Sequence, residues 1–353
     1  MDEKKICVAM SGGVDSSVAA YLMLQEGYTC VGVTAKLCDR SLLADAYSEQ
    51  YIDDARSVAA NLGMDFYPID GVEPFKKAVV DDFIVSYEAG LTPNPCFVCN
   101  RHIKFSYLLD KALEMGCRGI ATGHYARVHQ DETTGRYLLF KAKDEAKDQS
   151  YFLAGLTQEQ LSKVYFPLGE FTKTQIREIA ETQGFLTAKK KDSQDICFIP
   201  DGDFMSFIRR YTGKTYPCGA FLDPEGNTVG NHNGAIAYTL GQRKGLGLAM
   251  GTPVYVCSKN MAENTVTVGP EEALFSDTLV ANDWNWLPFP SLNEPIRVMA
   301  KARYRHIPQP ATVYPMDGGY ARVVFDTPQR ALTPGQTVVL YDGDMVVGSG
   351  TIQ

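Results

Sequence analysis

The stretch that decides the fold is residues 5–17, KICVAMSGGVDSS. Its apolar start, residues 6–10, predicts a buried parallel strand. Ser11, Gly12 and Gly13 then break the strand, and the two glycines allow a tight turn whose backbone amides face one anion. Residues 15–17 are types that cap a helix, so an apolar helix is expected over residues 18–24. A strand, a glycine turn and a helix N-terminus predict a phosphate site, because free amides and the helix dipole both attract negative charge.

This loop departs from the two common nucleotide-binding patterns. A Walker loop needs a lysine that reaches the β and γ phosphates, and no lysine follows these glycines. The dinucleotide pattern GxGxxG is also absent. The string SGGVDSS resembles the PP-loop of the N-type ATP pyrophosphatases. That resemblance implies a loop that holds the leaving pyrophosphate while the α-phosphate passes to an acceptor oxygen. An ordinary glycine turn would explain the two glycines but not the whole string.

Strands and helices alternate after the loop. Residues 28–34 and 66–69 read as strands, whereas residues 51–62 and 75–87 have helical spacing. This pattern predicts an α/β fold with a doubly wound parallel sheet and ligands at the carboxyl ends of its strands. A helix over 172–184 and a hairpin of 126–129 with 137–140 are also expected.

The sequence pattern changes near residue 205, where helical periodicity gives way to glycine, proline and short alternating runs. After about residue 278 the pattern is all β, which predicts a small barrel. Its five expected strands are residues 298–304, 312–314, 321–325, 337–340 and 346–352. The expected domains are therefore 1–204, a catalytic α/β domain; 205–275, a small central β-rich domain; and 276–353, a C-terminal β-barrel.

Composition sets broad limits on function. The 353 residues carry a net charge of -8, which counts against a general nucleic-acid binder but leaves room for a local basic face. Four basic residues at odd positions predict one such face on a strand: Arg297, Lys301, Arg303 and Arg305. No apolar run approaches the ~20 residues of a membrane span, and the N-terminus has no signal-peptide core. We therefore expect a cytoplasmic protein. Its nine cysteines, an odd number, argue against a disulfide framework.

Two cysteines stand in residues 92–105, TPNPCFVCNRHIKF. The prolines and the asparagine predict an irregular loop. Arg101, His102 and Lys104 follow Cys99, and positive neighbours lower a thiol pKa. Cys96 and Cys99 leave open half of a zinc site, although the chain has no second CxxC. A thioredoxin-like redox pair is the other open alternative.

Two further segments are basic. The lysine run 189–191 is either a solvated face or a hold on a phosphate backbone beside Cys197. The string TLGQRKGLGL at 239–248 suits a loop near RNA phosphates. Residues 120–127, IATGHYAR, predict a strand end followed by a loop in which Gly123 lets the backbone approach a ligand.

Four separated strings now converge: SGGVDSS, TPNPxxxCNxxIKF, GHYAR with KDQSYFL, and KKKDSxxICF. In this order, and over nearly the whole chain, they are similar to the tRNA-specific 2-thiouridylases. The resemblance implies replacement of the C2 oxygen of the wobble uridine (U34) by sulfur in tRNAs for Lys, Glu and Gln. It implies ATP as co-substrate, with Mg²⁺ to offset the triphosphate charge, and a central domain that binds tRNA. A sulfur donor protein is also implied, either a cysteine desulfurase or a relay protein.

The resemblance also assigns residues by position. Cys197 would carry a persulfide, and Cys99 would attack its inner sulfur to leave a transient Cys99–Cys197 disulfide. Such a bond needs Cα atoms roughly 4.4–6.8 Å apart, so a closing loop is expected to bring the thiols together. The ATP-binding residues would be Ala9, Met10, Ser11, Gly12, Gly13, Val14, Asp15, Ser16, Ala35 and Gly123. The target base, flipped from its stack, would meet Asn94, Pro95 and Cys96, and tRNA would contact Lys147, Asp148, Gln149, Arg303 and Tyr304.

One position departs from the family pattern. Members usually have Asp where this chain has Cys96, and a thiol of pKa ~8.5 is a poorer proton donor or acceptor of that kind. An alternative function is another PP-loop adenylating enzyme, an amidating synthetase or ligase, which needs no paired cysteines. A non-catalytic tRNA-binding protein is a second alternative, which the intact loop disfavours.

Overall fold

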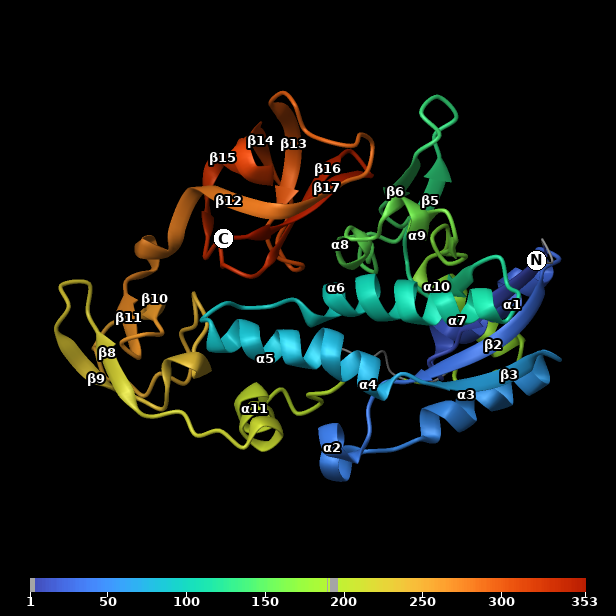
Figure 1. Cartoon of the computed structure of the whole chain (residues 1–353), viewed down its shortest axis with the longest axis horizontal. Coiled ribbons are helices and arrows are strands. Elements are labelled where there is room, and N and C mark those ends of the chain that lie inside the picture. The colour runs from blue at the N-terminus through green and yellow to red at the C-terminus, as the bar shows by residue number, and fades with distance from the viewer. Residues whose placement is uncertain (1–3, 189, 191–195) are drawn as a thin grey trace.

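The computed structural model describes residues 4–188, 190 and 196–353, which form an α/β body, a central sheet and a C-terminal barrel (Figure 1). The body contains five parallel strands in the order β3-β2-β1-β4-β7. From β1, strands are added through β2 and β3 on one side and through β4 on the other. The gap between β1 and β4 is therefore the switch point, where ligands bind in such sheets. The strands are β1 (Lys5–Ala9), β2 (Thr29–Lys36), β3 (Asp65–Asp70), β4 (Ile120–Thr122) and β7 (Val164–Tyr165).

Helices cover both faces of this sheet. Ile6 and Val8 of β1 pack against one helical layer, whereas Cys7 points to the opposite face and packs against the other. The predicted doubly wound sheet is thus confirmed. The first layer contains α1 (Val14–Gln25), α3 (Gln50–Asn61) and α10 (Lys173–Thr182); the second contains α7 (Leu108–Glu114), α8 (Ser150–Leu153) and α9 (Gln158–Leu161).

The remaining helical segments include one long rod, in which α4, the π-helical turn η2 and α5 follow one another without a break. Another π-helical turn, η3, continues directly from α6. The bounds are α2 (Arg40–Leu43), α4 (Val72–Phe75), η2 (Lys76–Val80), α5 (Asp81–Glu88), α6 (Pro95–Cys99), η3 (Asn100–Tyr107) and α11 (Phe204–Thr212). Short 3₁₀ turns are η1 (Ala44–Ala46), η4 (Ala235–Ala237), η5 (Glu271–Leu274) and η6 (Asp317–Gly319).

Two further sheets follow the body. The central sheet has the order β10-β11-β8-β9, with β8 (Gly219–Leu222), β9 (Thr228–His232), β10 (Tyr255–Asn260) and β11 (Thr265–Gly269). Pairing of the first barrel strand with the last closes the C-terminal barrel. Its strands are β12 (Phe275–Trp286), β13 (Ile296–Lys301), β14 (Gln309–Pro315), β15 (Ala321–Arg330), β16 (Thr337–Asp342) and β17 (Met345–Ile352). The predicted five strands lack β12, whose Asn and Asp residues are poor strand formers.

A seam joins the barrel to the body. The predicted hairpin is confirmed as β5 (Arg127–Gln130) and β6 (Tyr137–Phe140), and β6 continues the barrel sheet through the pair Phe140 and Met345. Arg136 donates to the carbonyls of Leu287 at 2.6 Å and Trp286 at 3.0 Å. Asn285 Nδ2 donates to the carbonyls of Ala154 at 2.8 Å and Leu156 at 2.9 Å.

The irregular loop predicted over residues 92–105 is not found. Most of this segment is helical, because α6 and η3 occupy it. The Asn94 side chain accepts from the backbone of Phe97 at 3.2 Å and caps α6. Pro95 takes the first helical position, where its missing N–H costs nothing. The same residues that suggested a loop therefore start a helix.

Three other expectations are corrected. Residues 15–17 do not cap α1, which already begins at Val14 after an N-cap Gly13 that makes no side-chain hydrogen bond. Helical structure does not end near residue 205, since α11 crosses that point. The four basic residues at odd positions do not share one strand face, because β13 ends at Lys301, before Arg303 and Arg305.

Within residues 4–188, 190 and 196–353, the structure contains no helix that combines the length and the apolar character of a membrane span.

The seam predicts a stability effect. Asn285→Ala leaves the carbonyl of Leu156 without its side-chain donor, while Ala154 keeps a bond from Ser349 at 3.0 Å. We expect the free energy of unfolding to fall by about 1–2 kcal/mol, measured by urea denaturation. Asn293→Ala, at an exposed position of the same domain, is the matched control. Equal stabilities of the two variants would contradict a role for the seam.

Candidate active site

The PP-loop, defined here as residues 11–17, lies at the carboxyl end of β1. Gly12 has a φ of +71°, and a Cβ built on it would lie 2.4 Å from the carbonyl oxygen of Tyr51. No other residue type fits there without a backbone shift. The Ser11 amide donates to Ser16 Oγ at 3.1 Å, and Ser16 and Ser17 Oγ donate to the Gly13 carbonyl at 3.1 and 2.9 Å. These bonds fix the turn, and no side chain caps the N-terminus of α1, so its first amides can bind an anion.

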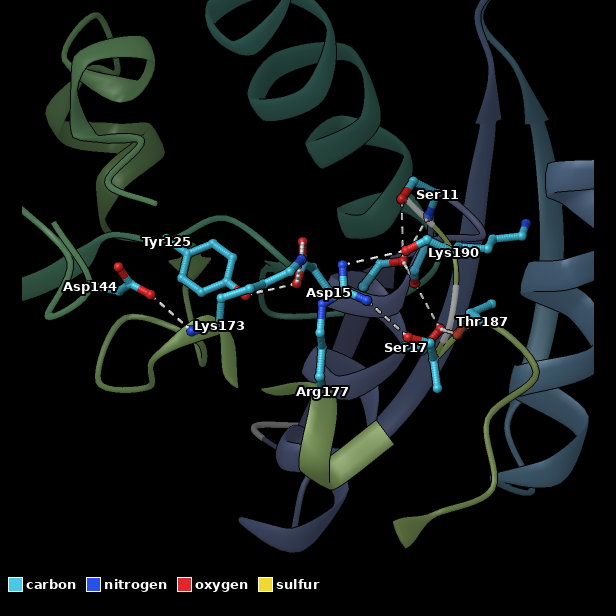
Figure 2. Close-up of polar contacts among 12 residues, drawn as sticks. Ser11, Asp15, Ser17, Tyr125, Asp144, Lys173, Arg177, Thr187 and Lys190 are labelled. Carbon is cyan, nitrogen blue, oxygen red and sulfur yellow. Dashed lines mark hydrogen bonds and ion pairs between the residues drawn. The ribbon is translucent and has the colours of Figure 1, made fainter. Parts of the chain in front are cut away.

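The Asp15 side chain of the PP-loop binds two residues that are distant in sequence (Figure 2). Lys173 Nζ lies 2.8 Å from each of its carboxylate oxygens, and Tyr125 Oη donates to Oδ1 at 2.7 Å. Lys173 is only 9% exposed and is the first residue of α10. Its own amide donates to Asp144 at 2.9 Å. The structure therefore supplies a buried cation to a loop that has no lysine in its own sequence.

A second cation and a hydroxyl reach the loop from the chain after α10. Thr187 Oγ1 lies 3.0 Å from Ser17 Oγ (Figure 2). Lys190 Nζ donates to the Gly12 carbonyl at 3.0 Å and pairs with Asp54. Lys190 is the member of the predicted lysine run that the structure describes, and Lys189 and Lys191 lie outside the described residues.

Gly123, just after the carboxyl end of β4, lies in close contact with the backbone of the PP-loop. A Cβ on Gly123 would lie 2.7 Å from the carbonyl carbon of Asp15 and from the amide nitrogen of Ser16. The expected close backbone approach at Gly123 is thus found, against the loop itself. Thr34 of β2 donates to the Met10 carbonyl at 2.6 Å, and Ala35 follows it. These predicted residues, with Ala9 at the end of β1, all belong to one edge of the sheet.

His124 follows Gly123 at this edge and contacts Lys104, whose charge acts on the thiols of Cys99 and Cys197. His124 Nδ1 lies 2.7 Å from Thr122 Oγ1, and its Nε2 lies 3.4 Å from Lys104 Nζ. Burial holds the pKa of His124 well below its usual value, and the Lys104 ammonium lowers it further. The neutral ring then accepts from Lys104 at Nε2 and donates from Nδ1 to Thr122. Lys104 belongs to the π-helical turn η3, a distortion frequent at functional sites.

The pKa values of the thiols near Lys104 are shifted in opposite directions. Burial raises the pKa of Cys99 to about 12, although the Lys104 ammonium opposes this. The predicted lowering at Cys99 is therefore wrong. Cys99 is 7% exposed, and Arg101, one of its basic neighbours in sequence, pairs instead with Asp283 at 2.9 Å. The pKa of Cys197 is lowered, first by a hydrogen bond from Cys38 and also by Lys104.

Cys38 is a residue that the sequence reading left without a role. It follows the carboxyl end of β2 and is buried. The pKa of Cys38 is raised, first by its interaction with Cys197 and also by burial. No local pattern could have shown this, because the two residues are brought together only by the fold.

The residues expected at the target base lie at the start of the helix that ends at Cys99. Asn94 and Pro95 start α6, and the exposed Cys96 and buried Cys99 lie in the same short helix. Lys104 lowers and Cys197 raises the pKa of both Cys96 and Cys99. Cys96 therefore belongs to the group of thiols around Lys104. Among the described residues no group of three or more His, Cys, Asp or Glu side chains is arranged to hold a metal ion.

The residues expected at tRNA near 148 have partners within the chain, of which those of Asp148 and Gln149 are side-chain bonds. Asp148 is 9% exposed and accepts from the amides of Ala142 and Ser150, each at 3.1 Å. Gln149 Oε1 accepts from the Tyr125 amide at 3.0 Å, which holds the loop after β4. Lys147 is half-buried beside them.

Arg303 and Tyr304 lie where the barrel meets the other parts of the chain. Arg303 donates to Thr333 Oγ1 and, at 3.3 Å, to the Leu240 carbonyl at the start of the basic loop 239–248. Burial lowers its pKa. The Tyr304 ring lies 4.4 Å from that of Phe152 between centroids. The structure thus gives both residues contacts that tie the barrel to its neighbours.

Comparison with known proteins covers almost the whole chain. Residues 4–201 match a family model described as the tRNA methyl transferase HUP domain. Residues 205–270 match the tRNA methyl transferase PRC-barrel domain, and residues 276–352 the aminomethyltransferase beta-barrel domain.

Full-length relatives are similar in sequence. The tRNA-specific 2-thiouridylase MnmA of Clostridioides difficile (strain 630) is 46% identical over 354 residues, 99% of this chain and 98% of that relative. The protein of the same name from Acetivibrio thermocellus is 48% identical over 359 residues and 100% of both chains.

Solved structures are more distant. The U34-tRNA thiolase NcsA from Methanococcus maripaludis with its [4Fe-4S] cluster has a TM-score of 0.35 and 19% identity, over 59% of this chain and 70% of that chain. A 4-thiouridine synthetase–RNA complex with bound ATP has a TM-score of 0.35 and 20% identity, over 59% of this chain and 50% of that chain. Similarity at this level carries no argument about function.

The opposite pKa shifts of Cys99 and Cys197 predict an order of reactivity. Because alkylation needs the thiolate, iodoacetamide at pH 8 should modify Cys197 at least about tenfold faster than Cys99. Lys104→Met should raise the pH midpoint of Cys197 alkylation by about one unit, while Lys104→Arg should not. Peptide mass spectrometry over a pH series measures both, with the exposed Cys218 as internal control. Faster modification of Cys99 than of Cys197 would refute the assignment.

Lys173 predicts an effect on phosphate chemistry. Lys173→Met removes the cation from Asp15, so release of pyrophosphate from ATP in the presence of unmodified tRNA should fall by about tenfold to a hundredfold. Lys163→Met, which removes an exposed ion pair with Glu159, is the control and should leave the rate unchanged. A normal rate in the Lys173 variant would remove Lys173 from the site.

Proposed function

Because the chain belongs to the family of tRNA-specific 2-thiouridylases, which are tRNA sulfurtransferases, we propose that it replaces the C2 oxygen of U34 with sulfur in tRNAs for Lys, Glu and Gln. One observation carries this proposal. His124 follows Gly123, which lies against the PP-loop, and Lys104, which contacts His124, lowers the pKa of both Cys99 and Cys197.

The first half of the reaction concerns ATP, taken with Mg²⁺ as the co-substrate complex. The C2 oxygen attacks the α-phosphate, and pyrophosphate leaves toward the amides of the PP-loop and the start of α1. Lys173 and Lys190 support this role because they bring positive charge to a loop without its own lysine. Ala35 and Gly123 line the nucleoside side at the carboxyl ends of β2 and β4. Asp15 is the carboxylate of the PP-loop that could bind the metal, and it would have to release Lys173 to do so.

The second half concerns sulfur. The donor protein, a cysteine desulfurase or a relay protein, transfers a sulfane sulfur to Cys197. A lowered thiol pKa supports this role, because a thiolate accepts sulfane faster than a thiol does. The terminal sulfur attacks C2 and AMP leaves. Cys99 then attacks the inner sulfur, which frees the sulfur for the base and leaves a Cys99–Cys197 disulfide for a reductant.

Cys99 must change state before it acts. Its pKa of about 12 keeps it protonated in this conformation. Insertion of a flipped base beside Asn94 and Cys96 would alter the packing that buries it. The proposal therefore places the gain of nucleophilicity at Cys99 after tRNA binding, so that the persulfide is not resolved by Cys99 before a base is present.

The rest of the chain is proposed to hold tRNA. The domains are taken as 1–204 for catalysis, 205–275 for tRNA binding and 276–353 for the barrel, in a cytoplasmic protein. Lys147, Asp148, Gln149, Arg303 and Tyr304 remain proposed tRNA contacts. Since Asp148 and Arg303 already have internal partners, they would act through the loops they hold or through a rearrangement. The names of the relatives give the amidating-synthetase alternative no support.

The two cysteines give the decisive test. Cys99→Ser and Cys197→Ser should each abolish formation of 2-thiouridine, because either change breaks the sulfur transfer, but should leave part of the ATP-dependent pyrophosphate release. Unmodified tRNA is incubated with enzyme, ATP and glutathione persulfide as the sulfane donor, and its nucleosides are analysed by mass spectrometry. Cys218→Ser, at an exposed cysteine just before β8 of the central sheet, is the control. Normal thiolation by both variants would refute the sulfur assignment.

A further inference from the structure

The barrel holds the start of the basic loop 239–248. Arg330, the last residue of β15, donates to the Gly241 carbonyl at 3.3 Å. Arg303, from the loop after β13, donates to the Leu240 carbonyl at 3.3 Å. Gly241 has a φ of +82°, and a Cβ built on it would lie 3.2 Å from Nη1 of Arg330. Two arginines and a close backbone approach therefore fix where this loop leaves the barrel.

The tip of this loop, defined here as residues 243–245, is anchored at both ends. Before the tip, the Gln242 carbonyl accepts from the Val256 amide at 3.0 Å, and the Gln242 side chain donates to the Lys244 carbonyl at 3.0 Å. After the tip, Leu246 is 7% exposed and belongs to the apolar core of the central sheet. The tip is therefore a short turn that projects from two fixed ends.

The two cations of the tip, Arg243 and Lys244, are exposed. In the part of the chain that the structure describes, neither of them pairs with a carboxylate, and the backbone amides of residues 243–245 make no hydrogen bond. Arg330 differs, because it forms an ion pair with Glu271 at 2.9 Å. Arg243 and Lys244 thus present uncompensated positive charge on a chain whose net charge is -8.

A short path of contacts joins this loop to the helix that carries Cys99. Arg303, which holds the loop, is followed by Tyr304, whose ring lies 4.4 Å from that of Phe152 between centroids. The Phe152 carbonyl accepts from the Asn100 side chain at 3.1 Å, and Asn100 is the residue after Cys99. A ligand as large as tRNA that binds at this helix can therefore also contact the tip.

An RNA backbone is the partner that this tip fits. Guanidinium, ammonium and free backbone amides are the groups that proteins use to bind phosphate oxygens of nucleic acids. The tip supplies all three within residues 243–245. Such contacts fix the position of an RNA but carry no sequence information, so the tip would serve every tRNA that the protein accepts.

We propose that Arg243 and Lys244 bind the phosphate backbone of tRNA, and that Arg330 is a positioning residue that holds their loop in place. The inference deepens the proposed function and rests on it, because it takes tRNA as the substrate. It assigns part of the charged contact with tRNA to a tip that lies outside the contacts proposed at residues 147–149 and 303–304.

The test measures the affinity of the full-length chain for unmodified tRNA over a series of salt concentrations. In the chain with both Arg243→Met and Lys244→Met, the slope of log affinity against log salt should fall in magnitude by about 1.4–1.8, since each phosphate contact contributes ~0.7–0.9. The KM for tRNA in the nucleoside assay should rise, with little change in kcat. Lys111→Met, which removes an exposed ion pair with Glu114 on α7, is the matched control and should keep the slope.

Arg330→Met tests the positioning role. In the chain with the native tip, this substitution should lower the affinity for tRNA, because the Gly241 carbonyl loses its donor. In the Arg243→Met, Lys244→Met chain it should cause no further change of slope. A further fall of about 0.7–0.9 in that chain would mean that Arg330 itself binds a phosphate, and would overturn its assignment as a positioning residue. Thermal unfolding of each variant shows whether its fold is kept.

Failure of this inference can be told apart from failure of the proposed function. An unchanged salt slope and KM in the Arg243→Met, Lys244→Met chain would overturn the inference and leave the proposed function standing. A fall in kcat at saturating tRNA, with the KM unchanged, would also overturn it, because the tip would then act on the chemical step. A wild-type chain that neither binds unmodified tRNA nor forms 2-thiouridine would refute the proposed function and this inference together.

Discussion

The backbone contact at the β1–β4 switch point is the constraint on which the site depends. Gly12 lies against Tyr51, and Gly123 lies against Asp15 and Ser16, both too close for a side chain. The PP-loop is therefore clamped between two neighbouring segments rather than standing as a free loop. Its amides keep their direction, as an anion site made of backbone donors requires. The same clamp sets the place of His124, the residue after Gly123, and through it that of Lys104.

Local patterns predicted the parts of this arrangement that local physics determines. The strand, turn and helix of residues 5–25 follow from an apolar run and two glycines, and the hairpin and α10 follow from their turn and capping residues. The prediction of an irregular loop after Thr92 is wrong because Asn and Pro favour both a loop and the start of a helix. Here Asn94 and Pro95 are adjacent, with Asn at the N-cap and Pro at the first helical position.

The site was predicted only in part, because its partners are distant in sequence. Lys173 reaches Asp15 over 158 residues and Tyr125 does so over 110, and no spacing rule joins them. Cys99 shows the opposite failure. Three basic residues follow it closely, but Arg101 is directed toward Asp283 and burial outweighs Lys104. Sequence proximity predicts which charges are available, whereas only the fold decides which of them a thiol meets.

The seam between the barrel and the body restricts how the molecule can adjust to a large ligand. Backbone pairing of Phe140 with Met345, the two bonds of Arg136 and the buried Tyr151 hydroxyl, which donates to the Thr337 carbonyl at 2.8 Å, all cross it. Swinging the barrel as a lid would break these hydrogen bonds together and lose the net stability that each contributes. The barrel is thus a fixed wall, and the shape change that admits a macromolecule has to come from short segments elsewhere.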